Sequence, residues 1–163
     1  MITSRRCLCA MLSALLFCGS CAVSPEAEER QRATEEEIKA ILSEPLAGEP
    51  QRCLADQEYR SFRALDDRRI LFEGRRGELW LNTLRMRCPD LRHSSVLVVR
   101  SIYTMRRICR MDSFQVTDWF SWPWYRRWPW HWGWGVGTTC VLGEFQPVNE
   151  AQVDAIEEAL RSR

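Results

Sequence analysis

Residues Tyr59–Pro89, YRSFRALDDRRILFEGRRGELWLNTLRMRCP, decide the fold of this chain. Three apolar runs of strand length are bounded by Asp-Asp-Arg and Arg-Arg-Gly, which are typical of tight turns. We therefore expect three short antiparallel strands here. Their apolar residues are expected to share one inward face: Phe62, Ala64, Ile70, Phe72, Leu79 and Leu81.

More strands are expected downstream, at Val96–Val99, Phe114–Thr117 and Cys140–Phe145. A helix is expected after Asn149, because this N-cap residue is followed by Gln152 at the third helical position. The predicted fold is mainly β (α+β): a small antiparallel sheet or barrel of about six strands, with a C-terminal helix and a short N-terminal helix.

Residues 1–20 are predicted to be a signal peptide. A positive start is followed by an apolar run at Cys7–Phe17, which is too short to span a bilayer. Gly19-Ser20-Cys21 then resembles the end of a bacterial lipobox, which makes Cys21 the expected lipidation site. Lipoproteins that stay in the inner membrane typically carry Asp directly after the lipidated cysteine. This chain has Ala22 at that position, which favours the outer membrane. Ordinary signal cleavage, releasing a soluble periplasmic protein, is the alternative.

Residues 21–50 are predicted to be a tether with a short helix. Residues 22–32 are polar and highly charged, which favours a flexible spacer. Thr34 and Glu37 have the spacing of a capping box, and Pro45 should end the helix that follows. Residues 51–163 are expected to form a single disulfide-stapled β domain.

Export determines the interpretation of the eight cysteines. Three leave with the signal peptide and Cys21 carries lipid, so four remain: Cys53, Cys88, Cys109 and Cys140. No two of these four cysteines form a C-x-x-C motif, so we expect no metal site, redox site or cofactor. An even number of cysteines in an oxidising compartment predicts two structural disulfides.

The expected meander of strands ranks the possible disulfide pairings. Successive chain reversals would place Cys53 and Cys109 at one end of the sheet and Cys88 and Cys140 at the other. Disulfide partners need Cα atoms within about 7 Å, whereas a six-residue strand spans roughly 20 Å. The favoured pairs are therefore Cys53–Cys109 and Cys88–Cys140. The main alternative is sequence-local pairing, Cys53–Cys88 with Cys109–Cys140.

Several motifs together resemble a family of small exported proteobacterial proteins catalogued as a domain of unknown function. They are CLxxxxxRSFRALDDRRILFEG, LWLNTLRMRCPDL, ICRMD and CVLGEFQPV, within residues 52–148. The resemblance implies no known reaction, cofactor or catalytic residue. A tryptophan-rich insert at residues 119–137 distinguishes this member.

The insert reads WFSWPWYRRWPWHWGWGVG and holds seven of the eight tryptophans. Three interpretations remain open: indoles packed on the body, a membrane-surface loop, or a platform for cell-wall glycan or a partner protein. The expected contact residues are Trp122, Trp124, Arg126, Arg127, Trp128, Trp130, Trp132 and Trp134.

The sequence offers little for catalysis or nucleic-acid binding. The net charge of +1 provides no global field for a nucleic acid, and the two histidines, His93 and His131, lack metal-ligand spacing. Asp66 and Asp67 are expected to cap a turn, although a carboxylate pair can also perform acid–base chemistry. We therefore expect a non-catalytic envelope lipoprotein. The alternative is a periplasmic enzyme or small-ligand binder with an acidic turn site at Asp66 and Asp67.

Overall fold

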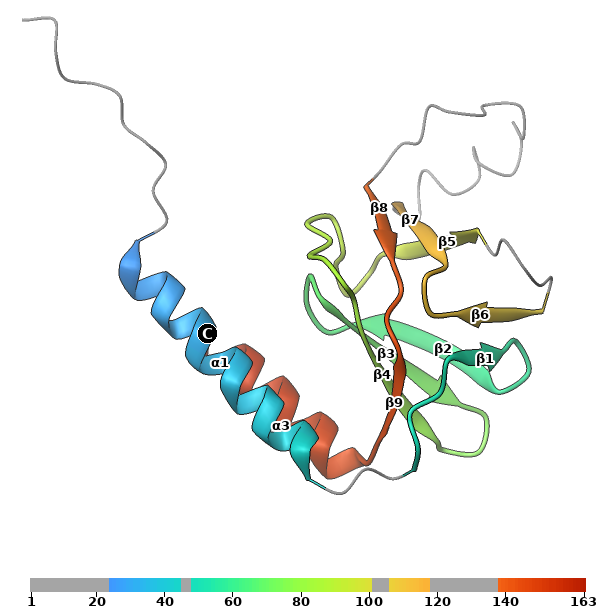
Figure 1. Ribbon diagram of the computed structural model, residues 1–163, viewed down its shortest axis with the longest axis horizontal. Helices are drawn as coiled ribbons and strands as arrows, with labels where there is room; N and C mark the ends of the chain where they lie inside the picture. The colour runs from blue at the N-terminus through green and yellow to red at the C-terminus, as the bar shows by residue number, and fades with distance from the viewer. Residues whose placement is uncertain (1–23, 45–47, 101–105, 118–137) are drawn as a thin grey trace, which may run out of the picture.

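The computed structural model describes residues 24–44, 48–100, 106–117 and 138–163. These residues form three layers, in which a pair of helices covers one face of a central sheet and further strands cover the other (Figure 1). The predicted mainly β, α+β class is confirmed. The described residues contain nine strands in three antiparallel sheets, rather than one sheet or closed barrel of about six.

The central sheet contains the three strands expected from the opening stretch. It consists of β2 (Tyr59–Ala64), β3 (Arg69–Gly74), β4 (Leu79–Thr83) and β9 (Phe145–Val148), in that spatial order. Each pair is antiparallel, and Phe72 lies opposite Phe62 on one side and Trp80 on the other. The first three strands thus form the predicted meander.

The remaining strands depart from a simple meander. One sheet has the order β5 (Val96–Arg100), β7 (Ser113–Thr117) and β8 (Thr139–Val141). A separate ribbon pairs β1 (Cys53–Ala55) with β6 (Arg107–Cys109). The single strand expected at Cys140–Phe145 is therefore wrong, because the chain leaves β8 after Val141 and enters the central sheet as β9 at Phe145.

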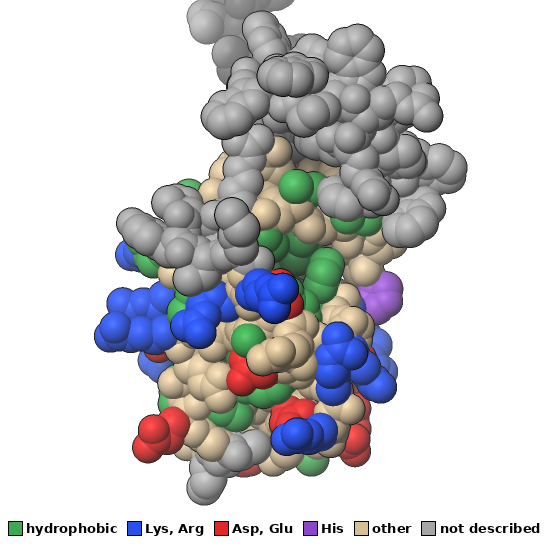
Figure 2. All heavy atoms as spheres, turned by 90° about the vertical axis from the view of Figure 1, so that its right-hand side faces the viewer, with side chains coloured by type: hydrophobic (Ala, Val, Ile, Leu, Met, Phe, Trp, Pro, Cys, Tyr) green, Lys and Arg blue, Asp and Glu red, His purple; other side chains and the backbone are tan. Residues whose placement is uncertain are grey.

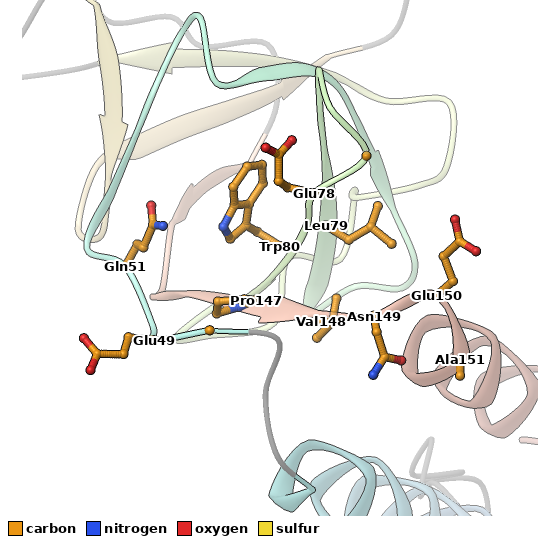
Figure 3. A pocket seen from close by; sticks show the side chains of 12 residues that line it. Glu49, Gln51, Glu78, Leu79, Trp80, Pro147, Val148, Asn149, Glu150 and Ala151 are labelled. Carbon is orange, nitrogen blue, oxygen red and sulfur yellow. The ribbon is translucent and has the colours of Figure 1, made fainter.

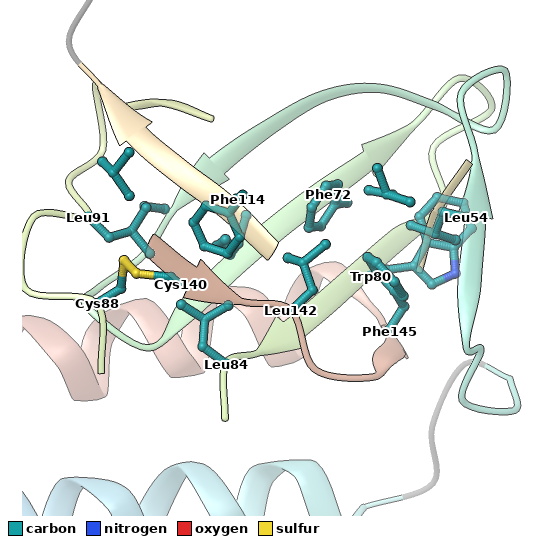
Figure 4. Packing of buried hydrophobic residues seen from close by; sticks show 14 residues of the cluster. Leu54, Phe72, Trp80, Leu84, Cys88, Leu91, Phe114, Cys140, Leu142 and Phe145 are labelled. Carbon is teal, nitrogen blue, oxygen red and sulfur yellow. A yellow bond between two sulfur atoms is a disulfide. The ribbon is translucent and has the colours of Figure 1, made fainter. Parts of the chain in front are cut away.

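Both faces of the central sheet are buried, which corrects the expected inward face. Ile70, Phe72 and Trp80 point into a core shared with the outer strands (Figure 4). Leu79 and Leu81 pack instead on the opposite side, against the helices. When a sheet is covered on both faces, its strands carry apolar residues at both odd and even positions. The alternation of polar and apolar residues then does not show which face a side chain points to.

Aromatic side chains dominate the core between the two β layers. The rings of Phe72 and Phe145 meet edge to face, with centroids 5.3 Å apart. Tyr59 makes a similar contact with Phe72 at 5.5 Å. Leu142 and Phe114, both fully buried, extend this core toward the Cys88–Cys140 disulfide (Figure 4).

The first helix, α1, is longer than expected and spans Pro25–Ser43. The predicted flexible spacer at residues 22–32 is therefore wrong from Pro25 onward. Ser24 is the N-cap, and its side chain accepts a hydrogen bond from the Ala27 amide at 3.3 Å. Thr34 does not cap the helix; its hydroxyl donates to the Arg30 carbonyl at 3.0 Å.

The C-terminal helix, α3, spans Glu150–Arg161 and has the predicted capping box. The Gln152 amide donates to Asn149 Oδ1 at 2.8 Å, and the Asn149 amide donates to Gln152 Oε1 at 3.1 Å. The Gln152 side chain also donates to the Ile41 carbonyl at 3.2 Å, which joins α3 to α1. Among the described residues, no helix is long and apolar enough to cross a membrane.

Two disulfides secure the outer strands. Cys53 pairs with Cys109 across the β1–β6 ribbon, with Cα atoms 4.0 Å apart. Cys88, which follows β4, pairs with Cys140 on β8, with Cα atoms 5.9 Å apart. These are the pairs that the sequence favoured, although the full meander used to rank them is wrong.

A tight turn between β6 and β7 contains Met111 with a φ of 77°. Residues with a Cβ atom are strained at positive φ, whereas Gly is not. The Asp112 amide donates to the Cys109 carbonyl at 3.1 Å, and the Asp112 carboxylate accepts from the Cys109 amide at 2.8 Å. These bonds hold the turn closed around Met111.

Met111→Gly is expected to raise the free energy of unfolding by about 0.5–1 kcal/mol, because it relieves backbone strain at a half-exposed position. Urea unfolding measures the effect. Met86→Gly is the matched control: Met86 is also exposed, but its φ is not positive, so this change should not stabilise. Equal effects of the two substitutions would contradict the assignment of strain to Met111.

Candidate functional site

The Asp66–Asp67 pair forms a turn that is held by arginines. Asp66 accepts from the Arg68 amide at 2.8 Å and from the Arg69 guanidinium at 2.7 Å. Asp67 pairs with Arg87 at 2.9 Å. The turn interpretation is thus confirmed, and these carboxylates are engaged in structural contacts.

Arg69 makes this turn a junction between two layers. Its side chain is only 3% exposed and binds both Asp66 and Glu35 of α1. A buried guanidinium needs charged partners, because an unpaired buried charge costs several kcal/mol. The acidic turn therefore helps to fix α1 on the body, which sequence reasoning did not predict.

The proposed lipidation and contact residues lie outside the described residues. Cys21 precedes the first described position. The predicted contact residues all lie within residues 118–137, which are not described either: Trp122, Trp124, Arg126, Arg127, Trp128, Trp130, Trp132 and Trp134. The structure does, however, describe the strands from which this segment departs and to which it returns.

The two ends of the tryptophan-rich segment are fixed beside each other. β7 and β8 are antiparallel neighbours, with Gln115 opposite Thr139. The Val116 amide donates to the Thr138 carbonyl at 3.3 Å, just where β7 ends and β8 begins. The Thr138 hydroxyl donates to Asp90, and the Cys88–Cys140 disulfide secures the same strand covalently. We call this arrangement the braced stem.

An open groove lies at the other end of the body, where α1 ends and α3 begins (Figure 3). It has a volume of about 690 Å³, and Trp80 and Pro147 lie opposite each other on β4 and β9 in its wall. Proline is tolerated on β9 because this is an edge strand of the central sheet. Sequence reasoning missed the groove, since Trp80 was not assigned to a face.

The groove combines an apolar wall with acidic edges. Glu49, Glu78 and Glu150 line it together with Leu79 and Val148, whose side chains are labelled in Figure 3. Its described lining contains no histidine, cysteine, serine or lysine, and no group of metal-ligating residues was found in the described part of the chain. The groove therefore combines an apolar wall with three carboxylates, and the described residues that line it include no nucleophilic cysteine or serine and no histidine.

A family model matches residues 3–163 of the chain. The chain belongs to this family of unknown function, DUF6491. The matched range includes both the N-terminal segment and the tryptophan-rich segment, and it extends beyond the residues 52–148 on which the resemblance was first based. No curated protein and no solved structure matches the chain significantly.

The surface of this DUF6491 member mixes both signs of charge. Figure 2 shows basic and acidic side chains interspersed over one face of the molecule. One such pair joins Arg110 to Glu144 beside the strained Met111 turn. This mixture agrees with the net charge of +1.

His93, His131 and Tyr59 are three further titratable residues of this DUF6491 member. His93 is exposed on the loop before β5, whereas His131 lies outside the described residues. Burial, followed by the nearby Asp56 carboxylate, raises the pKa of Tyr59, whose ring packs on Phe72. The Tyr59 hydroxyl is therefore neutral at physiological pH, and the Tyr59 ring packs in the aromatic core.

Proposed function

We propose that this DUF6491 protein is an exported lipoprotein, anchored to the periplasmic side of the outer membrane through Cys21. Its body presents the tryptophan-rich segment to the membrane surface, to cell-wall glycan or to an envelope protein, and does not catalyse a reaction. The signal-like start of the chain, Gly19-Ser20-Cys21 and the composition of residues 119–137 support the proposal.

The braced stem is the observation that carries the contact function. Strand pairing places Gln115 opposite Thr139, and the Val116 amide donates to the Thr138 carbonyl. A disulfide also ties β8 to the loop that follows β4. Such bracing reduces the freedom of the two attachment points, and a preorganised attachment lowers the entropic cost of binding. A scaffold of this kind suits a segment rich in indoles, which supply large contact areas at interfaces.

The enzymatic alternative based on Asp66 and Asp67 has less support. Both carboxylates are paired with arginines, and Asp66 also closes the turn through the Arg68 amide. Neither residue lines the groove at the Trp80 end of the body. We therefore assign Asp66 and Asp67 a structural role in the turn.

Changing Trp124, Trp128, Trp130 and Trp132 together to Ser is expected to leave the thermal midpoint nearly unchanged, because contact residues contribute to binding and not to the core. The same variant should lose the crosslinks that a photoreactive residue at Tyr125 forms with envelope components in cells. Differential scanning calorimetry and crosslinking on the same samples measure both effects.

Trp80→Ser provides the matched control, because Trp80 is only 6% exposed and packs in the aromatic core. This single change is expected to cost about 3–5 kcal/mol, as for other core aromatics. A comparable loss of stability in the fourfold variant would show that its indoles pack on the body, and would contradict the contact function.

A further inference from the structure

We infer that the protein is held on the membrane in one orientation, with the beginning of α1 against the bilayer and the Trp80 groove facing away from it. The inference deepens the proposed function and rests on the lipid anchor at Cys21. Its partner is a phospholipid surface, and its structural basis is the way α1 is built into the body.

The spacer between the anchor and α1 is too short to act as a flexible tether. Only residues 22–24 separate Cys21 from Pro25, the first residue of the helix. Even a fully extended chain spans at most about 3.6 Å per residue, so these two Cα atoms lie within about 14 Å of each other. The start of α1 therefore stays close to the bilayer whenever the acyl chains are inserted.

The helix transmits this constraint because it is fixed to the body. Ile38 is 1% exposed within the core formed by the helices and the central sheet. Glu35 binds the buried Arg69 of β3, and the Ile41 carbonyl accepts from Gln152 of α3. Contacts to two different elements prevent α1 from swinging as a separate rod, so the anchored end sets the position of the whole body.

The length of α1 then separates the two ends of the molecule. Its 19 residues span about 27 Å at 1.5 Å per residue. Gly48 and Glu49, which follow the C-terminal end of α1 closely in sequence, line the Trp80 groove. The groove therefore lies about one helix length from the anchored end and remains open to the aqueous compartment.

The braced stem lies on the anchored side. Figure 1 shows the start of α1 and the upper ends of β7 and β8 toward the same side of the molecule, with the remaining sheet below them. One flat bilayer can therefore meet both places. Near the start of α1, Glu26, Glu28 and Glu29 are followed by Arg30 and Arg32, so opposite charges nearly balance and this end carries no strong single-sign charge. The orientation should consequently depend little on salt.

Two probes on the same helix test the orientation. Glu28 and Lys39 are both exposed, and they lie eleven residues apart, which places them on nearly the same side of α1 and about 16 Å apart along its axis. A fluorescent non-canonical amino acid is placed at each position in the full-length lipidated protein. The protein is then reconstituted in phosphatidylethanolamine–phosphatidylglycerol vesicles that contain a headgroup quencher.

We expect at least threefold stronger quenching at Glu28 than at Lys39, and almost none at a third probe at Arg76, beside the groove residue Gly77. Inserting 20 Gly/Ser residues between Ala22 and Val23 should bring the Glu28 signal down to that of Lys39. Equal quenching in the original chain, or unchanged quenching after the insertion, would overturn the inference. Loss of vesicle association together with absent fatty-acid labelling would instead show that the anchor itself was assigned wrongly.

Discussion

Gly143→Ala is expected to lower the free energy of unfolding by about 3 kcal/mol or more, because overpacking and lost buried hydrogen bonds act together. A Cβ atom at this position would lie 1.9 Å from the Thr83 carbonyl oxygen, so the backbone must shift. That shift would break two bonds to the fully buried Asn82: its amide donates to the Gly143 carbonyl and its oxygen accepts from the Gly143 amide, both at 2.9 Å.

Urea unfolding of three variants separates these causes. Asn82→Ala removes both hydrogen bonds without a clash, and is expected to cost about 2–3 kcal/mol because it leaves the Gly143 backbone groups unpaired. Gly48→Ala is the matched control, since its new Cβ would make an ordinary 3.5 Å contact with Pro147 and should be nearly neutral. A Gly143→Ala variant as stable as Gly48→Ala would contradict the predicted close approach.

Gly143 also explains why the single strand predicted at Cys140–Phe145 is divided between β8 and β9 in the structure. The run Cys140–Phe145 is apolar enough to predict a single strand, and no pattern within it signals a change of sheet. In the structure, Leu142 and Gly143 cross from the outer sheet toward the central one, and the missing side chain lets the backbone pass Thr83. This close approach depends on a residue about sixty positions away, which local periodicity does not report.

The two helices show where capping and periodicity succeed and fail. The α3 cap was predicted because Asn149 and Gln152 form a local signal. The first half of α1 was missed because the side chains that it turns toward the body, Ala27 and Gln31, are small or polar. A helix stabilised by such contacts and by the Arg69–Glu35 pair has a composition typical of a spacer.

The candidate site was predictable only where its determinants are close in sequence. The Asp66–Asp67 turn followed from the chemistry of Asp next to a backbone amide, and the Arg68 amide is its partner. The Trp80 groove was not predictable, because β9 comes from the far end of the chain to place Pro147 opposite Trp80. The disulfide pairs were only partly predictable. Assigning each cysteine to one end of the sheet gave the correct pairs, even though β5–β8 do not continue the meander on which that assignment was based.

Cys21→Ala is expected to abolish fatty-acid labelling and to move the protein from the membrane fraction to the soluble fraction. Membrane affinity rises by about 0.8 kcal/mol for each buried CH2 group, so removal of the acyl chains removes most of the attachment. The change should not disturb folding, because both disulfides use other cysteines: Cys53, Cys109, Cys88 and Cys140. Metabolic labelling with a palmitate analogue and fractionation of membranes measure the result.

Cys18→Leu is the matched control for this experiment. Leucine is usual at this position of a lipobox, so the substitution removes a nearby thiol and should retain or increase labelling at Cys21. If Cys21→Ala is still labelled, the lipid is on another residue and the assignment is wrong. If Cys21→Ala loses the label but stays on membranes at an unchanged thermal midpoint, lipid is not the main attachment. Binding would then be attributed to the body, and the fourfold tryptophan variant combined with Cys21→Ala should release it.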